Sequence, residues 1–186
     1  MQISNTVNGV DIDRLVATID AVKADPALAR FQFRAGNTWI DGGRTSTTIK
    51  DFYGAGQEDA SRTEPFTVDV DEPPVLLGDN LAPNAGEYLL HALAACLTGT
   101  VVYHAAARGI VLEGLECTLE GDLDVQGLLG LAEGVRPGFA TIRATLRATG
   151  DFDDAELAEL AGLARFSPVR DTVSNPVPVH VRIERG

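Results

Sequence analysis

The sequence predicts an α+β domain in which a mainly antiparallel sheet wraps around one long central helix. Two observations support this prediction. Residues 88–107 are apolar on most helical faces, and strand-like alternation occurs on both sides of them in pairs typical of hairpins rather than of βαβ units. At 186 residues the chain has the size of a single domain with its own core.

The first element is an amphipathic helix over residues 11–25, and Pro26 follows its end. Its apolar side chains recur at helical spacing. They are Leu15, Val16, Ile19 and Val22. We interpret residues 1–28 as an N-terminal helical extension and residues 29–186 as the main domain.

Three strands are expected next. Phe31, Phe33 and Ala35 begin an alternating run towards Trp39, and the turn at 41–43 predicts a hairpin with the β-branched segment 45–49. Small and polar residues at 54–64 predict an exposed loop. Residues 66–70 then alternate again, and two prolines at 73–74 end that strand.

The central helix has signals at both ends. Asn84 is a candidate N-cap with Glu87 three residues later, which is the spacing of a capping box, and Gly109 is a candidate C′ residue. Such a helix would be about 36 Å long at ~1.5 Å per residue. This exceeds what a small domain needs, so we expect half of the helix to pack against a partner subunit.

The last part of the chain predicts two strands, a short helix and a final strand. Leu115, Cys117 and Leu119 alternate with polar residues, which places Cys117 on a buried face as core packing. A second strand follows at 142–148, and Asp153 caps a helix through about Leu163. The final strand carries Val177, Val179, Val181 and Ile183, with His180 on its polar face.

Composition excludes several classes of function. A formal net charge of −12 disfavours a nucleic-acid partner, and two separated cysteines make neither a zinc site nor a CxxC motif. Neither a GxGxxG nor a P-loop motif occurs, so we expect no cofactor and no metal. The first residues do not resemble a secretory signal, so we expect the protein in the cytoplasm.

Residues 88–107 approach the roughly 20 apolar residues that cross a bilayer. Polar side chains interrupt them, among them His91, Thr98 and His104, and Arg108 follows. A helix that is apolar on most sides is equally expected at the centre of a core or a dimer. We therefore expect no membrane association.

Cys96 is the strongest functional candidate, because it is the one reactive side chain midway along the central helix. A thiol in an apolar helix is normally inert, so reactivity requires a group that favours the thiolate. At about 100° per residue, Leu89 and Tyr103 share its face, and we expect them to line a ligand site. His104 lies about 80° round, either as a cap-region cation or with a chemical role. Arg44, beside the Gly-Gly turn, is either a candidate activator or an exposed hairpin cation.

The segment Pro83 to Leu97 resembles the OsmC/Ohr superfamily of osmotically inducible and organic hydroperoxide resistance proteins, as does the later Ser167-Pro168-Val169. The pattern Asn-x-x-Glu-x-Leu followed by Ala-Ala-Cys carries the match. Residues 1–28 and the Tyr53–Gly56 loop look like additions found in a larger subgroup. The resemblance implies an OsmC-like fold and an intertwined homodimer with sites at the subunit boundary.

The resemblance also implies a chemistry. In peroxidase members, the cysteine corresponding to Cys96 attacks the peroxide, and a second cysteine before Pro-Val resolves the sulfenic acid as a disulfide. This chain has Ser167 there. The acidic residue that orients the activating arginine aligns with Gly86, and the candidate acid Glu87 lies one place along.

We therefore expect a thiol-dependent peroxidase that reduces organic hydroperoxides at Cys96 by a one-cysteine mechanism, with an external thiol as reductant. In a variant of this hypothesis Cys117 resolves the sulfenic acid, which requires the two Cα atoms to lie within about 7 Å. In either version of the hypothesis we expect Ser167 to contribute to the ligand site.

Two alternatives stay open. One is a non-catalytic dimer of the same fold that binds a small lipophilic ligand in a stress response. The other is a hot-dog thioesterase, which also wraps a sheet around a helix, although the Ala94-Ala95-Cys96 match disfavours it.

Overall fold

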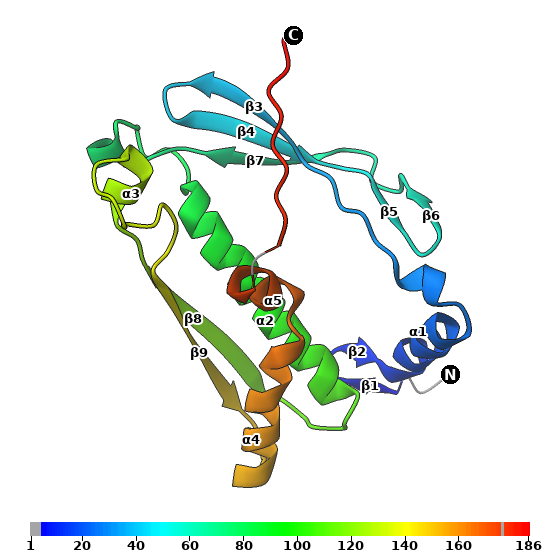
Figure 1. Cartoon of the computed structure of the whole chain (residues 1–186). Coiled ribbons are helices and arrows are strands. Elements are labelled where there is room, and N and C mark those ends of the chain that lie inside the picture. Colours follow the sequence, from blue (N-terminus) through cyan, green and yellow to red (C-terminus); the bar gives the residue numbers. More distant parts are fainter. Residues whose placement is uncertain (1–4, 176) are drawn as a thin grey trace. The chain divides into compact units, whose positions relative to one another are not determined.

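The structure is a computed structural model that describes residues 5–175 and 177–186 (Figure 1). Its internal contacts divide the chain into two units. One comprises residue 5 and residues 11–89, and the other comprises residues 6–10 and 90–186. The fold is α+β with antiparallel sheets and one long helix, as the sequence predicts.

The amphipathic helix predicted at 11–25 is α1, Ile12–Ala24. The Asp11 side chain caps it by accepting a hydrogen bond from the Arg14 N–H at 3.0 Å. A 3-10 turn at Pro26–Ala29 follows. None of the α1 side chains is buried within its unit.

A three-stranded antiparallel sheet forms the centre of the first unit. The strands β3 (Gly36–Asp41) and β7 (Phe66–Val70) pair on either side of β4 (Arg44–Ile49). Asp41 pairs with Arg44, so the turn has two residues, and the first of them is Gly42 at φ 51°. The hairpin predicted here is confirmed, although β3 begins only at Gly36.

The exposed loop predicted at 54–64 is wrong in its first half. Strands β5 (Phe52–Gly54) and β6 (Gln57–Asp59) form a second hairpin. Its turn residues, Ala55 and Gly56, have φ of 49° and 83°, and positive φ at both positions matches the twist of a two-residue hairpin. Alanine is rarely found in this conformation, so the sequence carried no strong turn signal.

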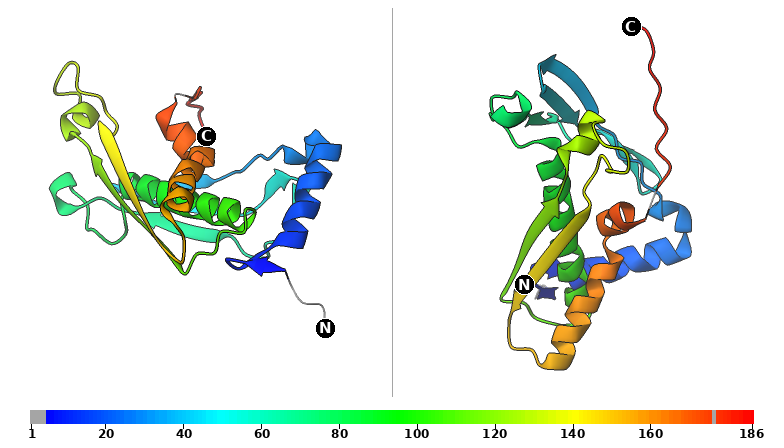
Figure 2. Two further views of the ribbon diagram at one scale, coloured as in Figure 1. Left: turned by 90° about the horizontal axis from the view of Figure 1, so that it is seen from below. Right: turned by 60° about the vertical axis from the view of Figure 1, so that its left-hand side comes forward.

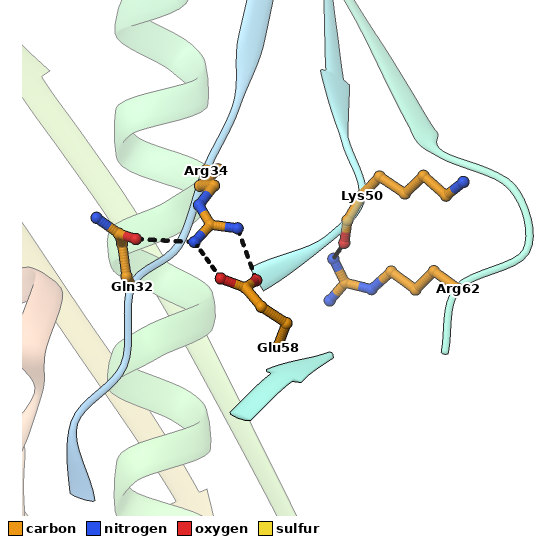
Figure 3. Close-up of polar contacts among 5 residues, drawn as sticks. All are labelled: Gln32, Arg34, Lys50, Glu58 and Arg62. Carbon is orange, nitrogen blue, oxygen red and sulfur yellow. Dashed lines mark hydrogen bonds and ion pairs between the residues drawn. The ribbon is translucent and has the colours of Figure 1, made fainter. Parts of the chain in front are cut away.

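Two arginines brace this hairpin (Figure 3). Arg34 donates to both carboxylate oxygens of Glu58 at 2.8 Å, and it also donates to the Gln32 side chain. The hydrogen bond from Arg34 lowers the pKa of Glu58. Arg62 donates to the Lys50 carbonyl at 2.7 Å, and its guanidinium carbon lies 5.3 Å and 5.2 Å from the ring centroids of Phe52 and Phe66.

The loop that leads to the central helix is organised by one buried carboxylate. Asp71 is 1% exposed and accepts hydrogen bonds from the N–H groups of Glu72, Asp79 and Leu81. These bonds, with the Leu81 N–H as the largest contribution, hold the pKa of Asp71 below its usual range. The loop includes a 3-10 turn at Pro74–Leu76.

The central helix is α2, Ala85–Ala106, and both predicted end signals are present. The Glu87 N–H donates to the Asn84 side chain at 2.9 Å, and the Asn84 N–H donates to the Glu87 carboxylate at 2.8 Å. At the other end, Gly109 has φ 75°, and the Ile110 N–H reaches back to the Ala105 carbonyl. This is a Schellman motif, so the assignment of Gly109 as C′ is confirmed.

The second unit packs α2 against a long hairpin and a helix (Figures 1 and 2). Strands β8 (Gly114–Asp122) and β9 (Thr141–Thr149) pair antiparallel with Cys117 opposite Leu146, and α4 covers Asp154–Leu163. A short helix, α3 (Val125–Leu129), lies between the strands. The buried core cluster comes from α2, the segment after it and α4, and consists of Val101, Ala105, Ile110, Leu160 and Leu163.

The start of the chain contributes to this second unit. Two-residue strands β1 (Thr6–Val7) and β2 (Val10–Asp11) flank a turn at Asn8 and Gly9. The Asn8 side chain donates to the Ile110 carbonyl at 2.9 Å and accepts from the Leu112 N–H at 2.8 Å. Part of the predicted extension is therefore tied to the loop that follows α2.

The strand predicted at 177–183 does not form. Residues 177–186 have no regular secondary structure, and the four alternating apolar side chains are half to fully exposed, namely Val177, Val179, Val181 and Ile183. A strand requires a neighbouring edge, and residues 177–186 pair with none in a single described chain. A helix that we did not predict, α5 (Pro168–Ser174), precedes this segment.

Candidate functional site

Cys96 lies midway along α2 as a free, partly buried thiol. Leu93 and Leu97, on the same side of the helix, are 4% and 2% exposed. The thiol is therefore set among apolar side chains, in a residue that is only partly buried.

The structure brings Cys96 together with Ser167. The Ser167 hydroxyl donates a hydrogen bond to the Cys96 sulfur across 3.1 Å, although the two residues are 71 positions apart. Ser167 is fully buried, and it ends the 3-10 turn Ala164–Phe166 and caps α5. Its oxygen accepts the Arg170 N–H at 3.2 Å, which is the N-cap interaction that starts the helix.

Cys117 is placed differently. Its thiol interacts with the Thr98 side chain, and partial burial raises the pKa of Cys117 while that hydrogen bond partly offsets the rise. Thr98 is two residues beyond Cys96 and so about 200° round the helix. Cys117 therefore packs on the opposite side of α2 from the Ser167 contact, which argues against Cys117 as the resolving cysteine.

The other predicted site residues make contacts that do not involve the Cys96 thiol. Glu87 is engaged in the capping box of α2. Arg44 begins β4, where its charge contributes to the lowered pKa of Asp71. Leu89 and Tyr103 are 38% and 58% exposed, and neither lines a cavity described below.

Two adjoining cavities lie within the second unit. One, of about 470 Å³, lies between α2, the β8–β9 hairpin and α4. The other, of about 340 Å³, extends from α2 and β9 to α5. They share Ala144, Leu146 and Ala164. The smaller cavity is bordered by Leu93 and Leu97, which flank Cys96, and by Arg170, Val173 and Ser174.

A cationic and aromatic cluster adjoins the segment that carries Ser167. The ring of His104 stacks on Phe166 with centroids 4.5 Å apart, and Arg165 lies over the same Phe166 ring. Arg108 donates to the His104 carbonyl and pairs with Glu159 at 2.8 Å. Partial burial, followed by the charges of Arg108 and Arg165, lowers the pKa of His104.

Sequence reasoning missed the short helix that positions Ser167. A serine followed by proline is a common N-cap and N1 pair, so Ser167-Pro168 was an available signal for α5. Arg170 and Val173 lie on that helix, which places them at the smaller cavity, so sequence reasoning missed them too. No group of three or more metal-ligating side chains gathers within residues 5–175 and 177–186.

Comparison with protein families assigns the fold. The family model described as OsmC-like protein matches residues 78–182, more than half of the chain. The chain therefore belongs to the OsmC-like protein family. No curated protein matches it.

Solved structures agree with this assignment. A Psychrobacter arcticus protein described as an osmotic stress induced and detoxification response protein is 15% identical, with a TM-score of 0.58 over 78% of this chain and 90% of that one. An OsmC-like protein from Mycoplasma pneumoniae is 16% identical, with a TM-score of 0.58 over 78% and 89%.

A third structure is an organic hydroperoxide resistance protein OsmC from Legionella pneumophila. It is 21% identical, with a TM-score of 0.54 over 76% of this chain and 88% of that one. At these identities the similarity shows a shared fold.

The length and apolarity of α2 are sufficient to cross a membrane, and among the described residues no other helix has both properties. The buried helix at the centre of a soluble core has the same properties, so this finding is weak evidence for a membrane span.

Proposed function

We propose that the protein is a thiol-dependent peroxidase that reduces organic hydroperoxides at Cys96. The observation that carries the proposal is the free thiol on α2, within the family match, in hydrogen-bond contact with a buried donor. The Legionella pneumophila protein of the same fold is named for organic hydroperoxide resistance. Cys96 lies in the helical motif through which the chain resembles this family.

The first half of the reaction oxidises the thiol. The Cys96 thiolate attacks the terminal peroxide oxygen, the O–O bond breaks, and the hydroxyl group transfers to sulfur as a sulfenic acid. The leaving alkoxide takes a proton from solvent and departs as an alcohol. Sulfur loses two electrons, and the peroxide gains them.

The second half uses an external thiol. Ser167 stands at the position of the resolving cysteine and Cys117 lies on the other side of α2, so neither side chain closes a disulfide with Cys96. One thiol condenses with the sulfenic acid, which releases water and forms a mixed disulfide. A second thiol then attacks that disulfide and regenerates Cys96.

The apolar surroundings favour organic hydroperoxides over hydrogen peroxide. The larger cavity is lined by aliphatic side chains, and the smaller one combines aliphatic side chains, among them Leu93 and Leu97, with Arg170 and Ser174. Burial of hydrocarbon stabilises a bound organic peroxide by about 25 cal/mol per Å² of apolar area, a gain that hydrogen peroxide lacks. We further propose that the active form is a cytoplasmic homodimer.

The test is intact mass spectrometry of reduced protein after brief, stoichiometric exposure to cumene hydroperoxide or hydrogen peroxide in the presence of a sulfenic-acid trap. We expect one trap adduct, faster with the organic peroxide, and no adduct in Cys96→Ser. Cys117→Ser is the matched control and should react like the wild type. A wild-type thiol that stays unmodified would refute the peroxidase.

A non-catalytic dimer that binds a small lipophilic ligand is the second candidate, and the volume of the two adjoining cavities favours it. Binding of an apolar fluorescent probe, weakened by Leu160→Arg at the larger cavity and unaffected by Cys96→Ser, would support this candidate if no peroxide reaction occurs.

A further inference from the structure

We propose that Ser167 is a catalytic residue that stabilises negative charge on the Cys96 sulfur through the hydrogen bond from its hydroxyl. The proposal rests on the proposed thiol chemistry at Cys96. It assigns to a serine, at the position where a resolving cysteine is expected, the task of supporting the thiolate. The serine and cysteine come from α5 and α2 of the same unit.

The direction of the hydrogen bond follows from the partners of the serine. The Ser167 oxygen already accepts the Arg170 N–H at 3.2 Å, and its proton is directed to the sulfur at 3.1 Å. A hydroxyl is a stronger donor than a thiol, and donation to a thiolate is a charge-assisted hydrogen bond. The backbone N–H polarises the hydroxyl, which further strengthens the bond to sulfur.

Burial makes this donor effective. Ser167 is fully buried, so water does not compete for its proton. Its position is fixed by the N-cap bond and by Pro168 at the first position of α5. The donor is therefore preorganised where charge develops on sulfur and requires little rearrangement when the thiolate forms.

Three nearby polar side chains of the second unit, Thr98, His104 and Arg165, have partners other than Cys96. The Thr98 hydroxyl interacts with Cys117 on the far side of α2. The His104 ring stacks on Phe166, and Arg165 donates to the Gly162 carbonyl. Arg170 has its side chain at the rim of the smaller cavity and contributes its N–H to Ser167.

The role leaves the atom balance of peroxide reduction unchanged. Ser167 retains its proton throughout, while Cys96 sulfur forms a bond to oxygen and the alkoxide leaves. The hydrogen bond from the hydroxyl stabilises the negative charge that the Cys96 sulfur carries when it attacks. Its loss should therefore appear in any reaction that requires the thiolate, including reactions without peroxide.

The experiment measures the rate at which iodoacetamide alkylates Cys96 as a function of pH, by peptide mass spectrometry. In Ser167→Ala we expect the profile to move to higher pH, with about a tenfold slower reaction at neutral pH, because hydrogen bonds to charged groups are among the stronger ones. Cys117 in the same molecule is the internal reference, and its profile should not move.

Ser167→Gly separates the donor from the helix cap. Glycine replaces an N-cap serine at a cost of only a few tenths of a kcal/mol, and it carries no hydroxyl. The glycine variant should therefore remain folded and show the same slower alkylation as Ser167→Ala. Ser167→Thr keeps the donor and should recover most of the wild-type rate.

An unchanged or faster alkylation of Cys96 in a folded Ser167→Gly variant would overturn the proposal. Alkylation involves no peroxide, so the two hypotheses fail separately. If the pH profile of Cys96 alkylation shifts but no sulfenic acid forms, the role of Ser167 is supported and the peroxidase function is refuted. If the protein reduces peroxide but the alkylation profile does not shift, the peroxidase function is supported and the role of Ser167 is refuted.

Discussion

Ser167 and Cys96 are close enough that one substitution should change the reaction that follows oxidation. Their side-chain heteroatoms are 3.1 Å apart, and a disulfide needs a separation of about 2 Å with suitable Cβ geometry. The serine oxygen cannot form that bond. A cysteine at position 167 would therefore lie close enough to Cys96 to form a disulfide with it.

We predict that Ser167→Cys forms a disulfide with Cys96 after one equivalent of organic hydroperoxide. A cysteine sulfur at this position lies within reach of the sulfenic acid and condenses with it, releasing water. Intact mass should show loss of two hydrogens, and peptide mapping should identify the pair. The same variant with Cys96→Ser should show no such loss, and a persistent trap adduct in Ser167→Cys would contradict the prediction.

We predict that the free energy of unfolding depends on pH through the protonation of His104. Burial and the charges of Arg108 and Arg165 lower the pKa of His104 in the folded protein. As the pH falls below the unfolded value of about 6.5, the unfolded state binds a proton before the folded state does, so the free energy of unfolding decreases. Above that pH both states are neutral and the effect vanishes.

The measurement is urea unfolding at pH 8 and at pH 5.5 for wild type and His104→Phe, which preserves ring stacking on Phe166. The wild type should lose more stability between the two pH values than the variant. Carboxylates with lowered pKa, such as Asp71 and Glu58, lose their contribution only at more acidic pH. Equal losses in the two proteins would contradict the role of His104.

At the scale of elements, α2 is defined by its ends. The reciprocal hydrogen bonds between Asn84 and Glu87 satisfy two N–H groups at its start, and the Schellman motif at Gly109 closes it. This capping function accounts for Glu87 without any catalytic role. The Glu87 carboxylate can thus be interpreted either as a helix cap or as a catalytic acid, and a substitution can distinguish the two.

We predict that Asn84→Ala lowers the free energy of unfolding by about 1 kcal/mol, because an N-cap acceptor is lost. Glu87→Gln keeps an acceptor and should change stability little. If Glu87 is only a capping residue, the Glu87→Gln variant should also form sulfenic acid at the wild-type rate. A slower peroxide reaction at unchanged stability would restore Glu87 as part of the site.

The elements that the sequence did not predict share a physical cause. The β5–β6 hairpin depends on a turn with Ala55 at positive φ, which alanine adopts rarely. The missing strand at 177–183 shows the converse, because alternation predicts a strand only where an edge is available to pair with it. Both outcomes depend on context outside the segment concerned.

For the whole molecule, the distribution of apolar surface bears on assembly. Only 28% of the most apolar part of α2 is buried, and the alternating residues Val179, Val181 and Ile183 are largely exposed. A single chain thus leaves apolar surface and strand-like backbone in contact with water, which favours self-association.

We predict a homodimer of twice the 19.7 kDa chain mass in sedimentation equilibrium. Val179→Lys combined with Val181→Lys should weaken association if the 177–183 segment contributes to the interface, because two charges replace apolar side chains. Charge introduced at the polar position His180, as His180→Lys, is the matched control and should leave the dimer intact. A monomer at micromolar concentration would contradict the prediction.

The sequence by itself determined the features that depend on neighbouring residues. These include the extent of α1, the caps of α2 and α4, the β3–β4 and β8–β9 strands, and the position of Cys96 on an apolar helix, since hydrogen bonds and periodicity within each segment specify them. Only the tertiary structure decided what surrounds the thiol. It brought Ser167 to Cys96 across 71 residues and placed Cys117 on the other side of α2, because packing of distant segments, rather than local pattern, sets those distances.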